Sequence, residues 1–591
     1  MANNNLSFLP TSKEEMDHLG WEEADIIIFT GDAYVDHPAF GAAIIGRYLE
    51  SKGYRVAIVP QPNWRDDLRD FRKLGRPRLF FGVTAGNMDS MVNHYTATKR
   101  LRSDDAYSPG GKAGFRPDYP SIVYTRAIRQ CFPDVPVILG GIEASLRRLT
   151  HYDYWQNNIK PSILVESGAD LLVYGMGEQA VESIADKLKM NVPLKSIRDI
   201  PQTVFLSDTV PPDIPEILML PSYEDCCSDR KKFAKAFTLL EQESNRMFPR
   251  PMAEKSGNKY VVVNPPFHLE TEKEIDRYYD LPYVRQPHPR YHKRGMIPAF
   301  EMIRHSVTLH RGCFGGCSFC TISAHQGKFI SSRSEASVLR ELSLISNMPG
   351  FRGTITDLGG PSANMYRMSG FDKTICVTCK RPSCIFPSIC KNLNTSHLPL
   401  IKLYDKALAV KGVKKVFIGS GVRYDLFVQR PESVSKRDHL NEYCHKLISR
   451  HVSGRLKVAP EHTSEKVLKV MRKPSFRLFY ALKEKFDTMN RQIGKKQQLI
   501  PYFISSHPAC TLDDMKQLAG ETRKLGFRLE QVQDLTPTPM TLASVMYYTG
   551  LDPYTMKPLY VARTRKEKEA QRDCFFWYKP LHAEGSRNRR K

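Results

Sequence analysis

The stretch RGCFGGCSFC (residues 311–320) decides how this sequence is interpreted, because it places Cys313, Cys317 and Cys320 in a C-x3-C-x2-C pattern. Three thiolates on one short loop can ligate three irons of a [4Fe–4S] cluster, since cysteinate is the usual ligand of such clusters. The fourth iron would then lack a protein ligand, as the metal of an open catalytic site does. The pattern therefore predicts a cluster with one free coordination position.

The surrounding sequence predicts an incomplete barrel. Apolar runs separated by helical patterns occupy residues 306–312, 353–360, 414–423, 455–462, 497–507 and 528–539. Six βα units of this kind predict a partial (β/α)6 barrel, whose active site belongs on the loops after the strands. The cysteine loop follows the first of these strands. This position favours a catalytic cluster over the alternative, a zinc site with His310 or His325 as its fourth ligand.

At these residues the sequence resembles the radical S-adenosylmethionine (SAM) superfamily, whose signature is C-x3-C-x-aromatic-C, with Phe319 as the aromatic residue. The resemblance implies that SAM chelates the open iron and is cleaved reductively to methionine and a 5′-deoxyadenosyl radical. This radical abstracts hydrogen from a substrate, which the sequence does not identify. A reductant such as a flavodoxin or a ferredoxin is implied as the electron donor.

Two further segments resemble SAM-binding parts of that superfamily. After the second strand, Gly359 and Gly360 resemble the Gly-Gly-Glu segment that receives the amino group of SAM, although a proline replaces the acid. After the fourth strand, Glu461 and His462 resemble the segment that contacts the ribose. The resemblance thus assigns these four residues and Phe319 to SAM binding.

The resemblance narrows to the YgiQ-type radical SAM proteins, a family without a characterised function. The stretches that carry it span almost the whole chain and are TGDAYVDHPAFG (30–41), LGGIEASLRR (139–148), RGCFGGCSFC (311–320), ICVTCKRPSC (375–384), GSGVRYDL (419–426) and VQDLTPTPMT (532–541). The family does not supply a substrate.

A second group of cysteines lies between the second and third barrel strands. Cys376, Cys379, Cys384 and Cys390 form a C-x2-C-x4-C-x5-C pattern within a Cys-rich insertion at 371–397. A C-x2-C turn presents two thiolates to one metal, and two more cysteines complete a four-sulfur shell. We expect a second metal site here, either structural zinc or an auxiliary iron–sulfur cluster, with chance clustering as the alternative.

The N-terminal part predicts a doubly wound, Rossmann-like parallel sheet. Apolar runs alternate with helical patterns, and polar side chains follow the strands at Asp32, Asp36, His37, Asn87, Glu143 and Glu178. Cobalamin domains share this fold and carry D-x-H-x-x-G after the first strand. Here His37 follows Asp36 directly and Gly41 comes four residues later, so the spacing argues against cobalamin.

These patterns divide the chain into an N-terminal Rossmann-like α/β domain (1–204), a connecting region (205–297), the barrel (298–560) and a basic C-terminal tail (561–591). The chain lacks a membrane span and a secretory leader, so we expect a cytoplasmic protein. Its 87 Lys+Arg against 63 Asp+Glu give a net charge of +24, which suits anionic partners. No RNA-recognition signature accompanies this charge, so nucleic-acid contact is the weaker expectation.

Three functions follow from these observations. The first is a radical SAM enzyme with an unknown substrate. The second is an RNA- or ribosome-directed modifying enzyme, such as a methylthiolase, which predicts salt-dependent RNA retention. The third is a non-catalytic iron–sulfur scaffold or electron carrier, whose cluster would not respond to SAM.

Overall fold

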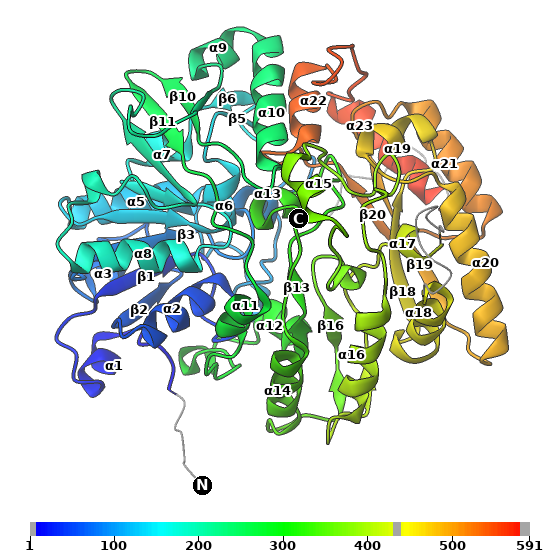
Figure 1. The fold of residues 1–591 in the computed structure, drawn as a ribbon, viewed down its shortest axis with the longest axis horizontal. Helices are drawn as coiled ribbons and strands as arrows, with labels where there is room; N and C mark the ends of the chain where they lie inside the picture. Colours follow the sequence, from blue (N-terminus) through cyan, green and yellow to red (C-terminus); the bar gives the residue numbers. More distant parts are fainter. Residues whose placement is uncertain (1–6, 429–438, 580–591) are drawn as a thin grey trace, which may run out of the picture.

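The structure is a computed structural model that describes residues 7–428 and 439–579. Two halves lie side by side, the first coloured from blue to green and the second from green to red (Figure 1). No helix within these described residues is long and apolar enough to cross a membrane.

The first half is built on a sheet. Its strands are β1 (Ile26–Thr30), β2 (Val56–Pro60), β3 (Phe80–Thr84), β4 (Val137–Gly140), β7 (Leu171–Val173), β8 (Thr203–Ser207), β9 (Leu218–Met219), β10 (Met252–Ser256) and β11 (Lys259–Val263). They pair in the order β2-β1-β3-β4-β7-β8-β11-β10-β9. The pairs from β2 to β7 are parallel, with Ile28 of β1 between Ile58 and Gly82. The predicted mixed α/β fold with a parallel sheet is confirmed.

Helices cover both faces of this sheet. Alternate residues of β1 enter different apolar clusters, Ile26 and Ile28 on one face and Ile27 and Phe29 on the other, because successive side chains of a strand point to opposite faces. The helices of this half are α1 (Lys13–His18), α2 (Gly41–Ser51), α3 (Arg69–Arg72), α4 (Ser90–His94), α5 (Pro120–Cys131), α6 (Gly141–Leu146), α7 (Ile163–Ser167), α8 (Glu178–Lys189), α9 (Tyr223–Ser228), α10 (Arg230–Ser244) and α11 (Glu272–Tyr279). A small hairpin is formed by β5 (His151–Asp153) and β6 (Asn158–Lys160).

The segment expected to connect the two domains contributes to the sheet. Strands β9, β10 and β11 lie within residues 205–297 and extend the sheet beyond β8. β10 and β11 form an antiparallel hairpin in which Ser256 pairs with Lys259 around Gly257. The flanking prolines concealed this hairpin in the sequence. The division of the chain at residue 204 stays a prediction.

The second half places strands at all six positions that the sequence predicted. They are β12 (Ser306–Thr308), β13 (His310–Arg311), β14 (Ser331–Ser332), β15 (Thr354–Ile355), β16 (Asp357–Gly359), β17 (Lys415–Val416), β18 (Arg455–Glu461), β19 (Gln498–Ser505) and β20 (Gln531–Asp534). β12 pairs with β16, β15 with β17, β18 with β19 and β19 with β20, all in parallel. β14 is an addition that pairs antiparallel with β13.

Helices separate these strands in the chain and pack around them. They are α12 (Pro298–Ile303), α13 (Ile322–Gln326), α14 (Glu335–Ser346), α15 (Lys373–Thr378), α16 (Leu398–Ala409), α17 (Asp425–Val428), α18 (Leu440–Lys446), α19 (Glu465–Met471), α20 (Arg477–Gln492), α21 (Leu512–Lys524), α22 (Leu542–Thr549) and α23 (Arg565–Asp573). α23 falls in the segment expected to be a basic tail, and its side chains of Lys568 and Gln571 are buried. Gln571 donates to the Cys510 carbonyl of the second half at 2.8 Å, and Lys568 donates to the Tyr154 hydroxyl of the first half at 2.7 Å. Residues 580–591 of that tail lie outside the described residues.

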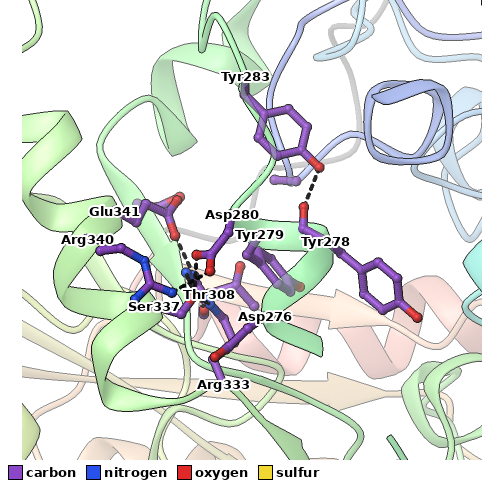
Figure 2. Close-up of polar contacts among 12 residues, drawn as sticks. Asp276, Tyr278, Tyr279, Asp280, Tyr283, Thr308, Arg333, Ser337, Arg340 and Glu341 are labelled. Carbon is purple, nitrogen blue, oxygen red and sulfur yellow. Dashed lines mark hydrogen bonds and ion pairs between the residues drawn. The ribbon is translucent and has the colours of Figure 1, made fainter. Parts of the chain in front are cut away.

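Polar contacts join α11 of the first half to α14 of the second (Figure 2). The Asp280 carboxylate accepts a hydrogen bond from the Ser337 hydroxyl at 2.7 Å. Arg333 is fully buried, donates to the Thr308 carbonyl at 3.0 Å, and lies 4.5 Å above the ring of Tyr279. Because Thr308 ends β12, these contacts fix the strand that leads to the cysteine loop.

Candidate functional site

The loop that carries Cys313, Cys317 and Cys320 begins at the end of β13. Gly312 and Gly316 have φ of +84° and +61°, and a Cβ at either would lie 2.0 Å and 2.3 Å from the carbonyl oxygens of Phe329 and Pro382. Only glycine fits such close approaches in the left-handed region without strain. These two glycines therefore allow the loop to turn tightly while it is packed against neighbouring backbone.

The three thiols lie near one another in a buried setting. Burial, as the largest cause, and the charges of Cys317 and Cys313 together raise the pKa of Cys320 to about 12. Burial and Cys317 also raise the pKa of Cys313. Gly315 adds no side chain, and a Cβ there would lie 3.3 Å from the Cys313 sulfur. Three thiols on one loop are the donor set that an iron–sulfur cluster requires.

One cation stands beside these thiols. Nη1 of Arg423 lies 3.5 Å from the Cys317 sulfur. Asp425 holds the guanidinium through Nε at 3.0 Å and Nη2 at 2.7 Å, so the cation has a fixed orientation. The sequence prediction missed Arg423 as a site residue, although GSGVRYDL was recognised as a family stretch. Its position after the third strand was the available signal.

The Cys-rich insertion packs directly on the cysteine loop. The Cys384 amide donates to the Phe314 carbonyl at 3.0 Å, which joins the two cysteine groups through the backbone. The pKa of Cys384 is raised to about 11. Burial is the largest cause, and the charges of Cys379, Cys390 and Cys376 contribute to the rise. Nζ of Lys328 lies 3.9 Å from the Cys379 sulfur. The second group thus gathers in one place beside the first.

No group of three or more His, Cys, Asp or Glu side chains within residues 7–428 and 439–579 is arranged to hold a metal ion. Metal binding at either cysteine group therefore stays a prediction.

The glycines assigned to SAM lie next to the cysteine strand. Gly359 pairs with Thr308 in parallel register, and its carbonyl accepts from the Leu309 amide at 2.7 Å. A Cβ at Gly359 would lie 2.6 Å from the Ser420 hydroxyl, and one at Gly360 would lie 2.7 Å from Nε2 of His310. Both positions are crowded, so backbone atoms are what this segment can offer to a ligand.

The other residues assigned to SAM differ in what they can contact. Glu461 is 7% exposed with φ of +69°, and its carboxylate lies 3.5 Å from Nζ of Lys473. Glu461 also contributes to raising the pKa of Cys320, which places it near the cysteine loop. His462 is fully buried, with Nε2 3.4 Å from the Cys510 sulfur. Its imidazole is therefore used inside the fold, and Glu461 is the better placed of the two.

Phe319, the aromatic residue of the cysteine pattern, packs on the apolar core of the second half. Its ring centroid lies 6.1 Å from that of His507 in an edge-on arrangement. Ser318 beside it contacts His507 at 2.9 Å. These contacts fix the end of the loop near Cys320.

Two of the polar residues that follow the N-terminal strands, Asp36 and His37, have their contacts within the fold. Asp36 forms a buried ion pair with Arg47 at 2.5 Å. His37 lies 2.8 Å from Nη2 of Arg285, and its Nδ1 accepts from the Ala39 amide at 3.1 Å. Burial and Arg285 hold the pKa of His37 well below its usual value. Both ring nitrogens of His37 thus face protein donors.

Two cavities adjoin the cysteine loop and share Arg148 in their walls. The first, of about 170 Å³, is bounded by Arg148, His325 and Lys328, and the second, of about 50 Å³, by Arg148, Cys317 and Cys320. Arg148 is 3% exposed, and its Nε has no hydrogen-bond partner within residues 7–428 and 439–579. Its guanidinium lies 4.8 Å above the ring of Tyr174. The sequence did not predict Arg148 as a site residue, although it lies in the family stretch LGGIEASLRR (139–148).

This fold and loop define a protein related to the radical SAM enzymes. A family model described as "Radical SAM N-terminal" matches residues 8–306, and a domain of unknown function, DUF3362, matches residues 530–583. A UPF0313 protein of Bacteroides thetaiotaomicron is 56% identical over 97% of this chain and 94% of that protein. UPF0313 protein YgiQ of Escherichia coli K12 is 44% identical over 97% of this chain and 84% of that protein. The chain belongs to the UPF0313 (YgiQ) family, as its motifs predicted.

One solved structure shares the fold at low sequence identity. TsrM, a radical S-adenosylmethionine methyltransferase from Kitasatospora setae solved with cobalamin and a [4Fe-4S] cluster bound, matches with a TM-score of 0.50 and 14% identity. The match covers 94% of this chain and 89% of that chain. This likeness shows a common arrangement of sheet and second half.

Proposed function

We propose that this protein is a radical SAM enzyme that holds a [4Fe–4S] cluster on Cys313, Cys317 and Cys320. The observation that carries the proposal is the loop itself, on which three partly buried cysteines follow the first strand of the second half. We interpret the parallel strands of this half as a partial (β/α)6 barrel, and barrel enzymes place their chemistry on the loops that follow the strands.

The residues around the loop have separate roles in this proposal. Arg423, oriented by Asp425, offsets the negative charge of the thiolates from 3.5 Å away. The backbone of Gly359 and Gly360 receives the amino group of SAM. Glu461 accepts hydrogen bonds from the ribose hydroxyls. When bound, the cluster and SAM supply one-electron cleavage of the sulfonium to methionine and a 5′-deoxyadenosyl radical, which takes hydrogen from the substrate.

Two features of the chain support chemistry that is shielded from water. The Cys-rich insertion covers one side of the cysteine loop through the contact between Cys384 and Phe314. The small cavity bounded by Arg148, Cys317 and Cys320 is where a substrate would approach the loop. The buried Arg148 guanidinium donates to the Ser145 carbonyl at 2.7 Å and has no carboxylate partner among the described residues, which favours an anionic group on that substrate. The electron enters from a separate reductant, such as a flavodoxin or a ferredoxin.

The experiment compares wild-type protein, Cys313→Ala and Cys227→Ala after anaerobic reconstitution. Cys227 is exposed and outside both cysteine groups, which makes it the matched control. We expect wild type and Cys227→Ala to bind iron and to convert SAM to 5′-deoxyadenosine after reduction. Cys313→Ala should bind about four fewer irons per chain than wild type and should form no 5′-deoxyadenosine. An intact cluster whose EPR signal does not change with SAM would reject the proposal in favour of an electron carrier.

We further propose a metal on Cys376, Cys379, Cys384 and Cys390. Their clustering beside Lys328 supports this site, because a nearby cation favours thiolates. Metal analysis distinguishes the two forms of the proposal. About four irons with one zinc per chain indicates structural zinc, and about eight irons without zinc indicates a second cluster. About four irons without zinc would show that this group binds no metal.

A further inference from the structure

A cavity of about 390 Å³ lies within the first half, between the sheet and the helices α2 and α8. Apolar strand residues such as Ile28, Ile138 and Val173 form its floor. Protein interiors contain few voids larger than a water molecule, whereas small-molecule pockets measure roughly 300–1,000 Å³. The cavity is thus too large for an ordinary packing defect and falls within the range of a ligand site.

Three glycines in the wall keep this space open. A Cβ at Gly82 would lie 3.6 Å from Cγ1 of Ile28, and one at Gly41 would lie 3.7 Å from Oδ1 of Asn87. At Gly140 the nearest atom would be 4.0 Å away, and none of the three glycines has a left-handed φ. These are ordinary contact distances, so neither the backbone nor the packing requires glycine. A side chain at any of the three would fill the cavity instead.

The mouth of the cavity lies at the base of the cysteine loop. Glu178 and Arg311 both line the cavity, are 1% and 3% exposed, and form an ion pair at 2.5 Å. Glu178 Oε2 and Arg311 Nη1 nevertheless have no hydrogen-bond partner in the described residues. A buried donor or acceptor left without a partner costs about 1–3 kcal/mol. A ligand that accepts from one atom and donates to the other would remove this cost.

The charges at the mouth restrict what the cavity can accept. Arg311 faces two carboxylates, Glu178 at 2.5 Å and Glu270 at 3.8 Å, so no positive charge remains to attract an anion. The floor of the cavity is a face of the sheet, and its roof is formed by α2 and α8. A space between a sheet and the helices that cover it suits a flat molecule. A ring N–H and a ring nitrogen match the unpaired oxygen of Glu178 and the unpaired N–H of Arg311.

We propose that this cavity binds a flat, uncharged nitrogen heterocycle whose polar edge faces Arg311 and Glu178. Its role beside the cysteine loop, as substrate or as part of a second cofactor, rests on the proposed function. Its binding does not. Arg311 stands two residues before Cys313, so the bound ring would lie next to the loop that we assign to the cluster.

The test measures the binding of benzimidazole to the full chain by calorimetry, without SAM or reductant. Indene, which has the same ring outline without nitrogen, is the matched ligand. We expect saturable benzimidazole binding and at least about fivefold weaker indene binding. Gly82→Val should weaken benzimidazole binding by at least about tenfold, which corresponds to about 1.4 kcal/mol. The control Gly520→Val, in open space on α21, should bind benzimidazole like wild type.

Gly82→Val should also raise the melting temperature, because it fills a void and adds a β-branched residue to a strand. If Gly82→Val does not fold, Gly140→Ala serves the same purpose with a smaller side chain. Absence of saturable benzimidazole binding up to solubility, or equal affinity in wild type and the filled variant, overturns the proposal.

Competition identifies the source of the ring. The benzimidazole arm of hydroxocobalamin has one free ring nitrogen and no ring N–H, so displacement of benzimidazole by it indicates that the cavity holds that arm of a corrinoid, with Arg311 as the donor and without a hydrogen bond to Glu178 Oε2. Benzimidazole binding without such displacement indicates a free heterocycle. Both outcomes support the heterocycle site. Formation of 5′-deoxyadenosine is assayed separately, so loss of the radical SAM proposal and loss of this one give different results.

Discussion

Replacing Glu341 with glutamine should lower the free energy of unfolding by about 3–5 kcal/mol. Glu341 is 4% exposed on α14 and lies between two buried arginines. One carboxylate oxygen pairs with Arg285 at 2.5 Å, and the other pairs with Arg333. Glutamine keeps the shape of the side chain but removes its charge. Both guanidiniums would then stay buried without the carboxylate, and breaking one buried pair alone costs about 3–5 kcal/mol.

The matched control is Glu335→Gln on the same helix. Glu335 pairs with Lys406 at the surface, where the two side chains are 30% and 55% exposed. An exposed pair contributes about 0–1 kcal/mol, and salt screens it. Urea unfolding at pH 7, followed by far-UV circular dichroism, measures both variants. Equal losses for Glu341→Gln and Glu335→Gln would refute the reasoning, because burial would then have added nothing.

Two other predictions concern the cysteine loop and the sheet. Gly316→Ala should displace the insertion from the loop and reduce iron bound after reconstitution, because its Cβ would lie 2.3 Å from the Pro382 carbonyl oxygen. The control is Gly20→Ala, because Gly20 also has a left-handed φ but lies in open space. This variant should lose only the roughly 1–2 kcal/mol of stability that the left-handed backbone costs, and it should bind iron like wild type. Burial raises the pKa of Glu254 to about 7 from 4.5, so the folded protein holds a proton that the unfolded chain releases, and stability falls as the pH rises between these values. The free energy of unfolding of Glu254→Gln, measured by thermal unfolding, should therefore exceed that of wild type by on the order of 3 kcal/mol above pH 7 and should equal it below pH 4.5. A difference that does not change with pH would contradict this.

The sequence located the strands because their apolar runs are long and end in glycine or polar loops. β1 begins with the continuous apolar run Ile26-Ile27-Ile28-Phe29, which predicts a strand buried on both faces. β10 and β11 escaped prediction since their hairpin is short and lies between proline-rich stretches. The turn residues Gly257 and Asn258 were the remaining local signal.

The cysteine loop could be predicted from the sequence, but its surroundings could not. Spacing alone identifies Cys313, Cys317 and Cys320, because the pattern is local. Arg423 reaches Cys317 across 106 residues of chain, and this contact depends on how the third strand follows the first. The cavity beside Gly82 could not be predicted from the sequence either, because a glycine in a strand also marks bulges and close backbone approaches.

The ion pairs across the junction of the two halves limit how ligands can reach the interior. Arg311 of the second half pairs with Glu178 of the first, and both side chains are buried. Opening the halves like a hinge would separate this pair and also expose Arg333 and Glu341. Such an opening is too costly to accompany each turnover. Molecules must therefore enter and leave between surface loops, and the size of those openings, more than the shape of the interior, limits which compounds the protein can admit.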